Sequence, residues 1–130
     1  MIRMRTLALA FAGLALGASG AAAADGRQLF LDNCSACHQV TGKGIPGAFP
    51  ALAGSKVALG PAPAAASIVL NGKGGMPAFR DDLSDADIAA VLSYVRTAWG
   101  NKAPPLTAAL VNPVRRTGKR ENPKAALTAH

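Results

Sequence analysis

Two cysteines and a histidine stand together in the run Cys34-Ser35-Ala36-Cys37-His38. Thiols three positions apart lie on adjacent edges of one helical turn, where each could form a thioether with one vinyl group of the same porphyrin. The imidazole of the next residue would then lie beneath the ring and could bind its iron. The pattern therefore predicts covalent attachment of one c-type haem through Cys34 and Cys37, with His38 as an axial ligand.

The same residues have blander interpretations. A redox dithiol of the thioredoxin kind needs a βαβ context, and the chain has no strand pattern. A zinc site usually needs four protein ligands, and beyond Cys34, Cys37 and His38 the sequence offers only His130. A disulfide across two intervening residues would close a very small, strained loop. Haem attachment is therefore the favoured interpretation.

Met76 is the candidate for a second axial ligand, which a haem that only carries electrons requires. Met1 and Met4 lie in a targeting segment described below, so Met76 is the remaining methionine. Three glycines before it let the backbone approach a flat ring closely, and Pro77 stiffens the loop behind the sulfur. Such a loop position is poorly explained as core filling. A His/Met pair would raise the reduction potential relative to harder ligands.

Residues 1–24 have the layout of a secretory signal peptide. Arg3 and Arg5 form a basic start, an apolar stretch runs from Leu7 to Leu16, and four alanines at 21–24 offer small residues for cleavage. The apolar stretch is shorter than the roughly 20 residues that span a bilayer. We therefore expect cleavage rather than an uncleaved anchor, and a periplasmic mature protein without a membrane span.

The net charge of +7 is unevenly distributed. Residues 25–100 carry equal numbers of acidic and basic side chains, so the excess comes from the signal segment and from residues 101–130. A near-neutral body gives no reason to expect a nucleic-acid partner. Residues 102–130 combine prolines, few large apolar residues and a basic cluster, which predicts a disordered tail. That tail is either an electrostatic tether for an acidic partner or a solvated segment without a role.

Helices are expected at three places along the chain. Asp25 and Gln28 give a capping-box-like start to a helix that runs into the cysteine motif. Residues 64–70 form a short helix, closed by an Asn-Gly pair. Ser84 begins a final helix, whose apolar positions recur at helical spacing and are Ile88, Val91, Leu92, Val95 and Trp99. The glycine- and proline-rich segments 41–60 and 73–83 are predicted loops, long enough to wrap a cofactor.

In their order and spacing, these motifs resemble the small class I c-type cytochromes of bacteria. The resemblance covers residues 25–101. Besides the cysteine motif, it rests on the segments 49–54, 75–79, 83–85, 94–96 and 99–101, which read Phe-Pro-Ala-Leu-Ala-Gly, Gly-Met-Pro-Ala-Phe, Leu-Ser-Asp, Tyr-Val-Arg and Trp-Gly-Asn.

This resemblance implies an all-α, cytochrome c-like fold of three to four helices wrapped around a covalently bound haem. It implies thioethers at Cys34 and Cys37 and axial ligation by His38 and Met76. Pro50 matches the proline whose carbonyl accepts a hydrogen bond from the ligand imidazole, a contact that fixes the ring orientation.

The resemblance also matches Gly26 and Tyr94 to positions where the first and last helices cross closely. The expected domains are a signal peptide at 1–24, a cytochrome c domain at 25–101 and a tail at 102–130.

The expected function is periplasmic transfer of one electron by a monohaem protein that is not itself an enzyme. Expected partners are redox proteins, namely a donor dehydrogenase and an acceptor cytochrome or oxidase. An alternative is a fixed cytochrome c subunit of a periplasmic dehydrogenase, so the protein is either a monomer or an enzyme subunit. A haem-based enzyme or gas sensor is the third interpretation, and it would require Met76 to leave the iron. Candidates for a docking patch are Ala36, Ile45, Pro77 and Ala78.

Overall fold

The computed structural model describes residues 24–118, where regular structure is helical apart from two isolated β-bridges. The helices are α1 (Gly26–Asn33), α2 (Ser35–His38), α3 (Ala62–Asn71), α4 (Asp85–Val95) and α5 (Ala108–Thr117). The predicted all-α class is confirmed. The described part holds more helices than the three to four expected, because α2 is separate from α1 and α5 was not anticipated. None of these helices has the length and apolar character needed to cross a membrane.

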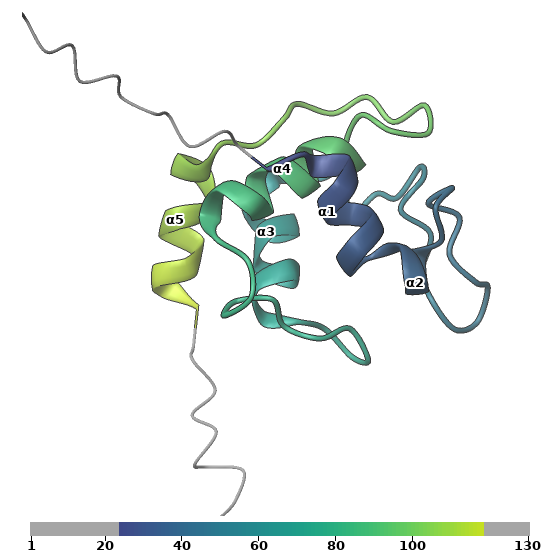
Figure 1. The fold of residues 1–130 in the computed structure, drawn as a ribbon, viewed down its shortest axis with the longest axis horizontal. Helices are drawn as coiled ribbons and strands as arrows, with labels where there is room; N and C mark the ends of the chain where they lie inside the picture. Colours follow the sequence, from purple (N-terminus) through teal and green to yellow (C-terminus); the bar gives the residue numbers. More distant parts are fainter. Residues whose placement is uncertain (1–23, 119–130) are drawn as a thin grey trace, which may run out of the picture.

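Helices α1 and α4 cross closely, as Figure 1 shows. A Cβ atom built on Gly26 would lie 2.2 Å from the carbonyl oxygen of Ala90 and 3.2 Å from Cβ of Tyr94. The predicted close approach at Gly26 and Tyr94 is therefore confirmed. Phe30 is fully buried beside this crossing, with its ring centroid 5.5 Å from Tyr94 and 5.1 Å from Trp99. The resulting aromatic cluster fixes the helix that leads into the cysteine motif.

The starts of α1 and α4 depend on side-chain caps. Asp25 accepts a hydrogen bond from the backbone N–H of Arg27, but Gln28 donates to Asp32 rather than completing a capping box. Ser84 and Asp87 do form a reciprocal capping box at the start of α4. The predicted cap at Ser84 is therefore confirmed.

Helix α4 ends at Val95, earlier than the apolar spacing predicted. Arg96 is almost fully buried, and its guanidinium donates to the carbonyls of Ala58, Gly60 and Pro104 at 2.7–2.8 Å. Trp99 then adopts a left-handed backbone, with φ 54°. The chain therefore leaves the helical path at this point, and Trp99 packs from outside α4.

The prediction that residues 102–130 are disordered is wrong for the part that the structure describes. Residues 101–107 lead into α5, which packs against α3 and α4 (Figure 1). Val111 is fully buried and Leu106 is 6% exposed, and both belong to the core formed with α3 and α4. Residues 119–130 lie outside the described range. The packed unit therefore extends at least to residue 118.

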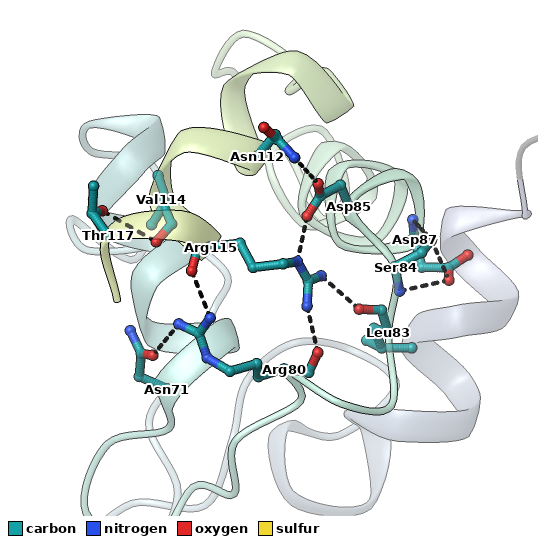
Figure 2. A network of polar contacts seen from close by, with 10 residues as sticks. All are labelled: Asn71, Arg80, Leu83, Ser84, Asp85, Asp87, Asn112, Val114, Arg115 and Thr117. Atoms are coloured by element: carbon teal, nitrogen blue, oxygen red, sulfur yellow. Dashed lines mark hydrogen bonds and ion pairs between the residues drawn. The ribbon is translucent and has the colours of Figure 1, made fainter. Parts of the chain in front are cut away.

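A charged contact joins α5 to the start of α4 (Figure 2). Arg115 Nε donates to Asp85 Oδ1 at 2.6 Å, and Asn112 Nδ2 donates to Asp85 Oδ2 at 2.9 Å. These hydrogen bonds lower the pKa of Asp85 below its usual value. The carboxylate also lies in the first turn of α4, where negative charge interacts favourably with the helix dipole.

We predict that Val111→Ala lowers the free energy of unfolding of the haem-loaded protein by about 2 kcal/mol, because it removes buried methyl groups and leaves a cavity. Denaturant titration measures this change. Leu110→Ala, on the 46% exposed neighbour, is the matched control and should change the stability by less than about 0.5 kcal/mol. Equal effects of both substitutions would show that α5 does not contribute to the core.

Candidate functional site

A cavity of about 450 Å³ opens among α3, α4, the α1–α2 junction and two loops. This volume is within the range of roughly 300–1,000 Å³ that small-molecule and cofactor sites occupy. Its walls are mainly apolar and include Ala65, Ile68, Val69, Val91, Leu92 and Val95. Cys34, His38, Pro50 and Met76 all line it, so four of the five predicted site residues come together. Cys37 lies on α2 directly before His38 and is not among the residues that line the cavity.

His38 has a defined tautomer because of its contact with Pro50. The imidazole is 8% exposed, and its Nδ1 lies 2.8 Å from the carbonyl oxygen of Pro50. A carbonyl oxygen only accepts hydrogen bonds, so Nδ1 must carry the proton and donate it. The lone pair of the neutral ring is then on Nε2. This is the form in which a histidine binds a metal while a backbone carbonyl orients its ring.

The two cysteines are free thiols, and their surroundings do not favour a reactive dithiol. Burial and the neighbouring Cys37 raise the pKa of Cys34 to about 11. A cysteine that acts as a nucleophile or binds a metal instead has a lowered pKa, because it lies near a positive charge, a metal or a helix N-terminus. Within residues 24–118, no three His, Cys, Asp or Glu side chains gather where they could hold a metal ion. The thioredoxin-like and zinc interpretations therefore have no support in the described part.

Met76 lies in a tight turn of the segment 72–83. The backbone groups of Lys73 and Met76 pair in both directions, at 3.0 and 3.2 Å. Gly72 has φ 73°, and a Cβ there would lie 2.5 Å from the carbonyl oxygen of Met76. Phe79 N–H then donates to the carbonyl of Val69 in α3 at 3.0 Å. These contacts hold the half-buried Met76 side chain at the cavity wall.

The loop that carries Pro50 is held by side chains from beyond α4. Asn101 is 6% exposed; its amide donates to the carbonyls of Leu52 and Val95, and its oxygen accepts from the N–H of Gly54 at 2.8 Å. Trp99 Nε1 donates to the carbonyl of Val40 at 2.9 Å. In the sequence, Asn101 stands out only as part of the Trp-Gly-Asn segment at 99–101. Its role depends on contacts 47 and 49 residues away, for which no local signal exists.

An apolar cavity, an imidazole whose Nδ1 is held by a carbonyl, two cysteines and one methionine together suit a haem. A c-type cytochrome is the class of protein that this fold and donor set define. Residues 21–95 match the sequence model of the family described as "Cytochrome C oxidase, cbb3-type, subunit III". The chain belongs to this family of c-type cytochrome domains.

The similar proteins include cytochromes c-552 and c6 and a cytochrome c subunit of a dehydrogenase. Cytochrome c-552 of Thermus thermophilus is 37% identical over 114 residues, covering 75% of this chain and 74% of the relative. Cytochrome c6 of Leptolyngbya boryana is 43% identical over 75 residues, covering 56% of this chain and 88% of the relative. The cytochrome c subunit of a quinone-type alcohol dehydrogenase of Gluconobacter oxydans is 33% identical over 106 residues. That match covers 72% of this chain but only 22% of the subunit's length.

These relatives are electron-carrying cytochromes or cytochrome subunits. The predicted class of protein, a c-type cytochrome, is therefore confirmed by family membership and by these relatives. The family also implies a haem cofactor. The way in which this chain's own residues hold the haem is taken up below.

We predict that Asn101→Ala destabilises the haem-loaded protein by about 2–3 kcal/mol, because it leaves buried backbone groups without partners. Unfolding in denaturant measures the loss. Asn33→Ala is the control, since Asn33 donates only to Leu29 within its own helix, and it should cost less than about 1 kcal/mol. A loss for Asn101→Ala no larger than that of the control would contradict the role given to Asn101.

Proposed function

We propose that this chain is a periplasmic monohaem electron carrier that binds haem c covalently through Cys34 and Cys37, with His38 and Met76 as axial ligands. The observation that carries the proposal is the cavity shared by Met76 and a His38 ring whose Nδ1 donates to Pro50. When bound, the haem supplies reversible one-electron exchange between Fe(III) and Fe(II).

The chain's own residues then have distinct tasks. The Pro50 carbonyl keeps the proton of His38 on Nδ1, which leaves Nε2 as the ligand atom and raises its basicity. The turn at residues 72–76 presents the Met76 sulfur, and a His/Met ligand pair favours a raised reduction potential. Apolar walls from α3 and α4 exclude water, which further tunes the potential. Occupation of both axial positions would leave no site for a substrate on the iron.

Partner docking is expected beside the cavity. The exposed apolar side chains Ile45, Phe49 and Val57 lie on the loop that bounds it, and Phe49 and Val57 also line it. Of the sequence-based candidates, Ile45 is 42% exposed, and Ala36, Pro77 and Ala78 are also exposed. Redox partners use small, short-lived interfaces, so a modest apolar patch is sufficient. The donor would be a dehydrogenase, and the acceptor another cytochrome or an oxidase.

Export of the chain completes the proposal. Residues 1–24 would act as a cleaved signal peptide and deliver the protein to the periplasm. Residues 119–130, which carry further basic side chains, lie outside the described range. For them both sequence-based interpretations remain open: an electrostatic tether for an acidic partner, or a solvated segment without a role.

A second candidate is a fixed cytochrome subunit of a periplasmic dehydrogenase. The similarity to dehydrogenase cytochrome subunits favours it. The similarity to cytochrome c-552, which extends over most of both chains, favours the small carrier. The two differ in whether the cytochrome purifies together with a catalytic subunit. The enzyme or gas-sensor interpretation needs an open axial position, which ligation by Met76 would deny.

We predict that Met76→Ala abolishes the methionine–iron charge-transfer band of the oxidised protein and lowers its reduction potential, because the thioether ligand is lost. Absorption spectroscopy and redox titration measure both. Pro77→Ala keeps the sulfur and is the matched control, so its band should persist. An unchanged band in Met76→Ala would remove Met76 from the ligand set. Rapid binding of carbon monoxide by the reduced wild-type protein would instead favour the sensor interpretation.

We predict that the double substitution Cys34→Ser/Cys37→Ser yields protein from which acid extraction removes all haem, since both thioethers are gone. Haem staining after denaturing electrophoresis measures covalent retention. Ser35→Ala, between the two cysteines, should retain the stain. Haem that stays with the doubly substituted chain under denaturing conditions would disprove attachment at these residues.

A further inference from the structure

Arg80 and Arg115 each donate hydrogen bonds to the other's backbone carbonyl, near the end of the segment 72–83 that carries Met76, as Figure 2 shows. Arg80 Nη1 donates to the carbonyl of Arg115 at 2.7 Å, and Arg115 Nη1 donates to the carbonyl of Arg80. Arg80 Nη2 also donates to Asn71 Oδ1 at 2.7 Å, and Arg115 Nη2 donates to the carbonyl of Leu83 at 2.7 Å. Together with the ion pair between Arg115 and Asp85, these hydrogen bonds connect α5, the segment 72–83, the end of α3 and the start of α4.

These contacts fix both ends of the segment that contains Met76. Asn71 is the last residue of α3, and Leu83 lies just before α4. Arg80 therefore joins the start of segment 72–83 to its end, and both arginines join that end to α5. Because Met76 lies within this segment, these contacts hold the two ends of the loop that carries it.

Gly118 provides independent support for this arrangement. A Cβ at this position would lie 2.1 Å from Arg80 Nη2 and 3.1 Å from Asn71 Oδ1. The absence of a side chain at the end of α5 is therefore what leaves room for the Arg80 guanidinium. Val111, fully buried in the core, anchors the other end of this helix. Helix α5 lies beyond residues 21–95, which match the family.

We propose that Arg115 is a positioning residue for Met76, which keeps the segment 72–83 closed so that the sulfur stays at the cavity. This inference rests on the proposed function, since it assumes that Met76 is the axial ligand. Arg115 acts through three acceptors, two backbone carbonyls and one carboxylate, which its rigid fork of donors can reach together. A lysine offers a single flexible ammonium and cannot replace that geometry.

The experiment is a titration of the oxidised, haem-loaded protein with free imidazole, which competes for the axial position of Met76. The apparent affinity of a competitor depends on the fraction of molecules in which the loop is open. We expect Arg115→Ala to raise the affinity for imidazole about tenfold, the effect of losing roughly one charge-assisted hydrogen bond. Loss of the methionine–iron charge-transfer band reports displacement of the sulfur.

Further variants separate positioning from folding and from charge. Gly118→Ala displaces the Arg80 guanidinium but leaves Arg115 in place, and it should raise the imidazole affinity in the same direction. Arg115→Lys should not restore the wild-type affinity. Arg116→Ala removes the same charge from an exposed neighbour on α5 and should leave the affinity unchanged.

Val111→Ala is the control for stability, because it weakens the packing of α5 without removing an arginine contact. If Val111→Ala raises the affinity as much as Arg115→Ala at equal loss of stability, α5 has only a structural role and the proposal is overturned. Wild-type affinity in Arg115→Ala overturns it as well. Failure of the proposed function is a different result, since Met76→Ala would then keep the charge-transfer band.

Discussion

The fold must keep two long segments without regular structure closed around an apolar cavity. Residues 39–61 and 72–84 form much of the cavity wall, and their backbone groups need hydrogen-bond partners wherever water is excluded. Turns within the segments satisfy some of these groups, such as the pairing between Lys73 and Met76. Side chains that follow the last turn of α4 satisfy many of the others; they are Arg96, Trp99, Asn101 and Arg115. The cavity therefore depends on the C-terminal part of the described chain.

Arginine is suited to this task for a physical reason. Arg96 is buried to 97% and binds three carbonyl oxygens, and no carboxylate of the described residues 24–118 pairs with it. Burying a charge is costly unless hydrogen bonds replace its hydration, and a guanidinium offers five donors in a fixed plane with which to do so. Arg115 likewise binds backbone carbonyls. Its side chain is partly exposed, and the carboxylate of Asp85 also balances its charge. In both cases one side chain ties together segments that are distant in the sequence.

Local chemistry explains which parts of the molecule could be predicted from the sequence. The cap at Ser84 follows from interactions within a few residues, whereas the close approach at Gly26 was expected from the family resemblance. Helix α5 was missed because the average composition of residues 102–130 is basic and rich in proline. Within the described residues 102–118, only Leu106 and Val111 are buried, so the apolar signal is weak, and Pro113 lies inside the helix. Packing against α3 and α4 outweighs that local preference. Contacts such as that between Asn101 and Leu52 have no sequence signal, because they depend on the completed fold.

The two sides of the candidate site are held by separate anchors. Asn101 and Trp99 bind the loop that carries Pro50 and so act on His38, whereas Arg115 binds the segment that carries Met76. A functional site needs a geometry that is held in advance by surrounding contacts, and separate anchors allow His38 and Met76 each to be held without constraining the other. Changes in α5 would then alter the methionine side while the hydrogen bond between His38 and Pro50 persists. Since α5 lies outside residues 21–95, which match the family model, the methionine side of the site depends on residues beyond that range.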